Sequence, residues 1–243
     1  PPGPHALGMV RNRLAPPRDT RGAVLLLHGF GQNRYTWHLP ARSFSCYLAE
    51  RGWDVFNVDL RGHGRSRRFG ARRPHALVEH VHHDVPALAR EAMALSGHDD
   101  VVLIGHSMGG LIAYSVAASS LRGRVRALVS IGSPYRWALG SRVLSGLSGV
   151  LTALRFTGMF DRNPPVPLRM LGRHLRKRRA LWDTKLVPMP LRAWTPGSVE
   201  AEVLDDYLGR AFDWTSMQVA FDIFRWGQRA VLRADGTADW GAA

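Results

Sequence analysis

The chain has 243 residues, enough for one α/β domain with an inserted segment. Hydrophobic residues make up 45% of it and charged residues 21%, which is ordinary for a soluble globular protein and argues against a disordered or fibrous chain. No stretch has the length and hydrophobicity of a membrane-spanning helix. The single cysteine, Cys46, excludes an internal disulfide framework, and we expect it to act as a small apolar side chain in a helix.

The formal net charge is +14, and nearly all of the positive charge is arginine. A strongly positive charge is compatible with binding to nucleic acid, to an anionic membrane surface or to an acidic substrate. Because the arginines are spread along the chain without a nucleic-acid-binding motif, we favour a compositional bias and expect no nucleic-acid partner. The dense cluster at 173–179 keeps a peripheral membrane contact open as a less favoured alternative. No signal-peptide-like apolar segment stands near the first residues, which slightly favours a cytoplasmic location.

The first predicted elements are strands. Residues 6–14 give a weak signal for an opening strand, and the apolar run from Ala23 predicts a strand buried on both faces, as in a parallel sheet. This run ends in the turn His28-Gly29-Phe30. A histidine directly before such a turn is expected to orient the loop through hydrogen bonds rather than to act as an acid or base.

The next elements are a strand at Val55–Val58 and the loop Asp59–Ser66, DLRGHGRS. The glycines fit a tight loop that needs positive φ angles. Within this loop His63 is a candidate catalytic residue, but its place in a glycine-rich turn favours a structural role.

A helix is then predicted from Asp84, as its N-cap, to about Leu95. The histidines just before it raise the question of a metal site, but no further ligand is evident. We therefore expect a solvated loop and helix start. The residues concerned are His80, His82, His83 and Asp84.

Residues 101–110, VVLIGHSMGG, carry the most informative pattern. Four aliphatic residues predict a buried strand, and a helical pattern begins near Met108. Between the two, Gly105 and Gly109 flank a tight turn that exposes Ser107. Glycine fits both positions because a Cβ would clash where the strand folds back against the helix. The helix N-terminus would face the point where negative charge develops on a substrate.

After a further strand at 127–131 the pattern changes. Apolar residues at helical spacing occupy 141–160, several prolines follow, and helices are predicted at 199–209 and 216–231. Five of the eight tryptophans fall in this last third of the chain. We expect each tryptophan to pack within these helices, and the helices together to wall an apolar pocket.

In this order the strands, the His28-Gly29-Phe30 turn, the glycine-rich loop and the Gly105–Gly109 elbow resemble the α/β-hydrolase superfamily, particularly its lipase, esterase and serine-peptidase-like members. The resemblance covers about residues 20–135. It implies an α/β fold with a mostly parallel, doubly wound sheet, here partial, and a helical cap insertion. The implied segments are a core at 1–135, a cap at 136–230 and a linker at 231–243 toward core strands missing at the C-terminus.

The resemblance implies that Ser107 is the nucleophile and that the backbone amides of Phe30 and Met108 stabilise the oxyanion. A serine at this position argues against the relatives that use aspartate there, the epoxide hydrolases and haloalkane dehalogenases. No metal and no organic cofactor are implied. Residues implied to support the elbow and the turn are Gly105, His106, Gly109, Gly110, His28 and Gly29.

A serine nucleophile also needs a base and an orienting acid, which in this fold follow it along the chain. Of the eleven histidines only His174 comes after Ser107, within a basic stretch that predicts an exposed helix face. Asp235 and Asp239 lie in a tail rich in glycine and alanine and are expected to be linker residues. We therefore expect these 243 residues to lack the triad acid and base and to be inactive alone.

The expected function of the parent protein is cleavage of a carboxylic ester or a lipid-like acyl substrate through an acyl-serine intermediate. Serine peptidase or acyltransferase activity stays open, because the same elbow serves different leaving groups. From a different class, a non-catalytic hydrolase-like module could bind a lipid or a partner through the cap. The sequence assigns neither the acyl chain length nor the oligomeric state.

Overall fold

The structure is a computed structural model that describes residues 6–14, 19–133, 161–185 and 194–229, with isolated positions within 146–158 and 233–239. Sequence expectations for 141–160 therefore fall largely outside the described residues, as does the boundary expected at 136.

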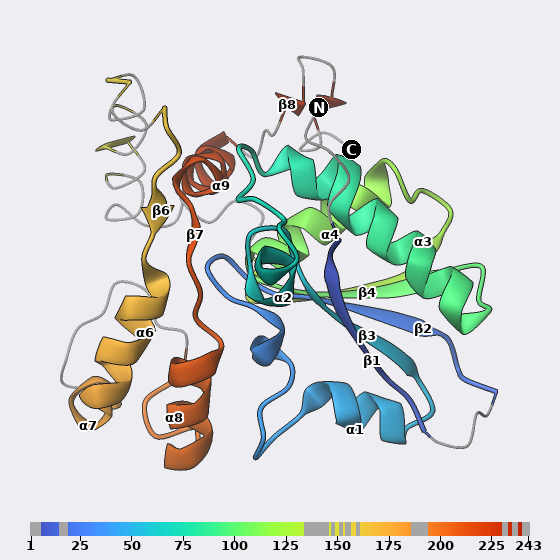
Figure 1. The fold of residues 1–243 in the computed structure, drawn as a ribbon, viewed down its shortest axis with the longest axis horizontal. Coiled ribbons are helices and arrows are strands. Elements are labelled where there is room, and N and C mark those ends of the chain that lie inside the picture. The colour runs from blue at the N-terminus through green and yellow to red at the C-terminus, as the bar shows by residue number, and fades with distance from the viewer. Residues whose placement is uncertain are drawn as a thin grey trace.

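A five-stranded sheet in the order β1-β3-β2-β4-β5 forms the centre of the described part (Figure 1). β1 runs antiparallel to β3, and the other neighbouring strands are parallel. The mostly parallel sheet predicted from the apolar runs is thus confirmed. The strands are β1 (Gly8–Asn12), β2 (Ala23–Leu27), β3 (Asp54–Asp59), β4 (Val101–His106) and β5 (Val125–Ile131).

Helices cover both faces of the sheet (Figure 1). Leu25 and Leu27 of β2 belong to a core shared with α3 (Val85–Ser96) and α4 (Met108–Ala118). The alternate residues Val24 and Leu26 of β2 belong to a second core, which includes Ala49 of α1 (Phe44–Glu50). Because successive side chains of a strand point to opposite faces, β2 lies between two helix layers with both faces buried, which accounts for its uniformly apolar sequence.

The outer strand β5 is less buried than its neighbours. Val129 and Ile131 are 43% and 42% exposed, whereas every residue of β2 and β3 is buried. Among the described elements, only β4 and α4 make extensive contact with β5. This edge and face of the sheet are therefore uncovered within the described residues.

A second group of helices lies beside the carboxyl ends of the parallel strands (Figure 1). It has a small core of its own, in which Leu175, Leu204 and Leu208 are buried against the partly buried Trp182 and Trp194. None of the described helices combines the length and hydropathy that a membrane span requires. The elements of this region are β6 (Pro165–Val166), α6 (Leu168–Lys177), α7 (Arg179–Trp182), α8 (Ala201–Arg210), β7 (Thr215–Ser216), α9 (Met217–Arg229), β8 (Arg233–Ala234) and β9 (Ala238–Asp239).

The expectation of a solvated segment before α3 is wrong for His80 and Asp84, which are buried, whereas His82 and His83 are exposed as expected. α3 follows Asp84 as predicted, but the Asp84 side chain does not cap it. Instead its carboxylate binds Arg61 at 2.6 Å and His80 Nδ1 at 2.7 Å, and all three side chains are buried. Arg61 comes from the glycine-rich loop, so no local pattern around Asp84 reveals it. Although burial disfavours its charge, His80 and Arg61 lower the pKa of Asp84 below its usual value. No metal-binding cluster occurs among the described residues.

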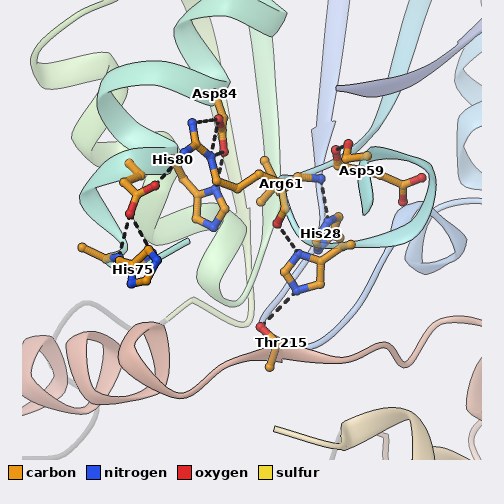
Figure 2. Close-up of polar contacts among 12 residues, drawn as sticks. His28, Asp59, Arg61, His75, His80, Asp84 and Thr215 are labelled. Atoms are coloured by element: carbon orange, nitrogen blue, oxygen red, sulfur yellow. Dashed lines mark hydrogen bonds and ion pairs between the residues drawn. The ribbon is translucent and has the colours of Figure 1, made fainter. Parts of the chain in front are cut away.

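Two further buried imidazoles lie between the core and β7 (Figure 2). His28 Nε2 accepts from the N–H of Leu60 at 3.0 Å, which leaves Nδ1–H to donate to the Gly29 carbonyl at 2.9 Å. His63 bonds through Nδ1 to the Arg61 carbonyl and through Nε2 to Thr215 Oγ1 at 3.0 Å. Both rings use both nitrogens, and burial lowers the pKa of each.

We predict that the protein loses stability as the pH falls. Because the pKa of His28 and of His63 is lowered in the folded state, the unfolded chain binds more protons below about pH 6.5. The free energy of unfolding should be fully retained above that pH. Below it, each ring should remove up to about 1.4 kcal/mol per pH unit, until its folded-state pKa is reached. Urea unfolding across this range measures the slope.

The contribution of one ring is isolated by comparing variants. His63→Gln should reduce the pH dependence, whatever its effect on stability at neutral pH. His174→Gln, at an exposed position on α6, should leave the slope of the parent unchanged. Equal slopes in His63→Gln and the parent would contradict this account.

Candidate active site

Ser107 is held in a strained turn between β4 and α4. Its φ is 51° and its ψ is −116°, a region that costs a residue other than glycine on the order of 1–3 kcal/mol. Its N–H donates to the Ile131 carbonyl of β5 at 2.9 Å, and its carbonyl accepts from Gly110 and Leu111 of α4. The backbone is thus fixed from both sides. The hydroxyl stands half-buried at the end of the strand, without a hydrogen bond to any described residue.

Close backbone approach explains the two glycines of the elbow. A Cβ on Gly105 would lie 2.4 Å from the carbonyl atoms of Gly109, as the sequence predicts. A Cβ on Gly109 would lie 2.4 Å from the Leu27 carbonyl oxygen. The obstacle at Gly109 is therefore β2, not the elbow strand. Gly110 is equally tight, since its Cβ would lie 2.1 Å from Ser133 Oγ.

The turn after β2 lies directly against the elbow. A Cβ on Gly29 would stand 3.3 Å from Ser107 Cβ and 2.9 Å from His106 Nδ1. Phe30 follows Gly29 in this turn, and Met108 opens α4. Neither the Phe30 nor the Met108 N–H donates a hydrogen bond to a described residue. The structure therefore brings together the residues that the sequence nominated for the nucleophile and the oxyanion site.

Gln32 connects this turn to the elbow and to α8, and no local sequence pattern predicts this role. Its side chain is buried, and Oε1 accepts from the Gly29 N–H at 3.0 Å and from His106 Nδ1 at 2.9 Å. Its Nε2 donates to the Tyr207 hydroxyl of α8. Burial raises the pKa of Tyr207 to about 12, so the phenol keeps its proton at neutral pH. Gln32 and Tyr207 are 175 residues apart, and no local motif links them.

His106 precedes Ser107 but does not form a hydrogen bond with its hydroxyl. Its ring is mostly buried, donates to Gln32 and packs edge-on against Trp37 at 6.4 Å between ring centroids. Burial lowers the pKa of His106, which favours the neutral ring. His106 is therefore placed to support the turn.

The described residues do not supply a base to Ser107. His28 and His63 use both nitrogens in other bonds, and His80 is tied to Asp84. His174 lies on the exposed side of α6, next to the Trp182 ring. Of the two aspartates of the tail, Asp235 falls outside the described residues and Asp239 belongs to β9.

The late tryptophans pack mainly as structural residues. Trp182 and Trp194 adjoin the small core of α6 and α8, and Trp226 is fully buried in the main core. Trp240 lies outside the described residues. The apolar acyl pocket expected from the cap composition stays a prediction.

The chain is similar in sequence to known hydrolases. The chain is 34% identical over 110 residues to the pimeloyl-[acyl-carrier protein] methyl ester esterase of Citrobacter koseri, covering 45% of this chain and 36% of that protein. It is 28% identical over 158 residues to epoxide hydrolase 3 of Xenopus tropicalis, covering 63% of this chain and 40% of that protein. The chain thus spans less than half the length of these curated relatives.

A carboxyl esterase from Bacillus coagulans has a similar fold. The TM-score is 0.61 at 20% identity, over 93% of this chain and 69% of that one. A family profile described as the alpha/beta hydrolase fold matches residues 22–181, which run from β2 through the elbow to α7. With this match over more than half of its length, the chain belongs to the α/β-hydrolase family.

Proposed function

We propose that the protein is a serine hydrolase that cleaves a carboxylic ester through an acyl-serine intermediate. The observation that carries the proposal is the Ser107 hydroxyl, free of described partners at a strained strand end beside the Gly29–Phe30 turn. In this mechanism Ser107 Oγ attacks the carbonyl carbon and the alcohol leaves. Water then hydrolyses the acyl-serine ester and restores the hydroxyl.

The amides of Phe30 and Met108 are the proposed oxyanion donors. Both belong to the elements that meet at Ser107, and both are free of described acceptors. The N-terminus of α4 adds a favourable field for negative charge at the same place. Donors of this kind contribute on the order of 3–4 kcal/mol each to stabilising the transition state.

The functions of the relatives support ester chemistry at the level of the reaction class. They include a methyl ester esterase and a carboxyl esterase. An epoxide hydrolase is among them as well, but the residue at the elbow of this chain is a serine, which suits acyl transfer. A peptidase or an acyltransferase would use the same elbow.

The proposal assigns the catalytic base and acid to residues other than those described. Ser107 has no imidazole in hydrogen-bond contact within the described part of the chain. The same observation favours the second candidate function, a non-catalytic hydrolase-like module. The two differ in one measurable respect, since only the hydrolase forms a covalent acyl adduct on Ser107 during turnover of an ester.

The test of the hydrolase is trapping of that adduct in the natural protein. We expect a mass increase on the peptide that contains Ser107 after brief exposure to p-nitrophenyl butyrate, and loss of both adduct and turnover in Ser107→Ala. Ester binding without adduct or turnover would instead identify the non-catalytic module.

For the 243 residues alone, we predict slow ester hydrolysis. Removing the base of a serine hydrolase lowers turnover by about a millionfold, and the oxyanion site and binding retain about 10³–10⁴-fold over water. Release of p-nitrophenol measures the rate, and Ser107→Ala should lower it little further. Turnover typical of an esterase that Ser107→Ala abolishes would show that the base lies within these residues.

Gln32 is proposed to position the oxyanion turn. In Gln32→Leu the backbone N–H of Gly29 and the ring Nδ1–H of His106 lose their common acceptor at a buried position, which costs about 1–3 kcal/mol for each unsatisfied group. Tyr207→Phe is the matched control, because it leaves one buried donor, Gln32 Nε2, without its acceptor and should cost about 1–3 kcal/mol in total. Urea unfolding measures both, and hydrogen exchange of the Gly29 amide should accelerate in Gln32→Leu alone. Equal effects of the two variants would contradict the assignment.

A further inference from the structure

Two neighbouring pockets lie where the core meets the cap, and Arg67 lines both. The first has a volume of about 280 Å³ and is lined by five arginines and a single carboxylate: Arg34, Arg67, Arg68, Arg169, Arg210 and Asp213. The second, of about 390 Å³, adds Arg72, Arg73, Arg162 and His75 and has no carboxylate in its lining. The fold brings the arginines of the segment 67–73 together with Arg34, Arg162, Arg169 and Arg210 from distant parts of the sequence.

Existing ion pairs account for only part of this charge. In the first pocket Arg34 pairs with Asp59, Arg67 with Asp213 and Arg210 with Asp206, each at 3.0 Å. Asp213 also accepts from the backbone N–H groups of Gly64 and Trp214, so its oxygens are fully engaged.

Two guanidinium groups of the first pocket are left over. Arg68 and Arg169 have no carboxylate partner among the described residues. Arg169 stands in the first turn of α6, whose N-terminus also favours negative charge. Arg68 stands opposite, at the end of α2 (Gly64–Arg68). A guanidinium offers several N–H donors in a planar fork that matches the oxygens of phosphate.

The second pocket holds an unsatisfied donor. Arg73 Nε is buried and has no hydrogen-bond partner in the described structure, although a terminal nitrogen of the same group approaches the Asn163 carbonyl at 3.5 Å. A buried charged donor without an acceptor is costly, and the guanidinium group that carries it belongs to a residue that lines the pocket.

We propose that the two pockets form a binding site for phosphate groups carried by a small ligand. Hollows lined by arginine suit compact tetrahedral anions better than a flat membrane surface. The first pocket adjoins the proposed oxyanion turn, because the Asp213 N–H donates to the Gly31 carbonyl at 2.7 Å. The site does not depend on hydrolase activity, and it is tested by binding alone.

Isothermal titration of the chain with inorganic pyrophosphate at low ionic strength tests the site. We expect saturable binding that weakens with added salt and falls on the order of 100-fold in the double variant Arg68→Gln/Arg169→Gln. The matched control, Arg90→Gln/Arg122→Gln, removes the same charge from exposed positions outside both pockets and should bind as the parent does. No binding by the parent, or equal loss in both double variants, would overturn the proposal.

A second arm identifies the source of the phosphate. Hexanoylglycerol phosphate carries the group on an acyl ester, and hexanoylglycerol is the same ester without it. Binding of the phosphorylated ester that exceeds pyrophosphate binding, and that requires Arg68 and Arg169, would assign the phosphate to an acyl substrate. Equal or stronger binding of pyrophosphate would assign the site to a free anion. Tight binding of unphosphorylated hexanoylglycerol that pyrophosphate does not displace, with no pyrophosphate binding, would count against a phosphate site.

Discussion

The rest of the structure depends on how closely three backbone segments approach one another at Ser107. β4 must turn back into α4 against β2, and the absence of a Cβ at Gly105 and Gly109 makes this approach sterically feasible. The serine between them takes a positive φ, a strain that its hydrogen bond to β5 and the start of α4 hold in place. The position of the Ser107 hydroxyl is therefore set by the packing of the surrounding backbone.

Near Ser107, buried side chains with hydrogen bonds to one another hold the segments together. Gln32 joins the turn, the elbow and α8, while His63 joins the glycine-rich loop to β7 through Thr215 (Figure 2). The bonds from Gln32 to Tyr207 and from His63 to Thr215 connect the core with the part of the chain that follows β5. Because burial lowers the pKa of His28 and of His63, protonation of those rings destabilises the junction.

Local sequence patterns were sufficient for the sheet and the elbow. The apolar runs of β2, β3 and β4 and the glycine spacing around Ser107 are short-range features with a direct physical meaning. His80 and Asp84 were expected in a solvated segment, and their burial was missed because their partner Arg61 meets them only after folding. The arginine pockets were missed for the same reason, since residues from 34 to 210 contribute to one hollow. A charge spread evenly along a sequence can still be concentrated in space.

The central claim is that the elbow and the Gly29–Phe30 turn form a preformed oxyanion site lacking only a proton acceptor among the described residues. A thiolate attacks without giving up a proton, so the variant Ser107→Cys tests the oxyanion site without the need for a base. The further substitution Cys46→Ser removes the one other thiol of the sequence. The measurement is the rate at which p-nitrophenyl acetate acylates the thiolate introduced at position 107. This rate is compared with the acylation rate of a small free thiol that has the same pKa and is present at the same thiolate fraction. The account predicts acylation of this variant on the order of 100-fold faster, as one working oxyanion donor would give. A rate equal to that of the free thiol would contradict it.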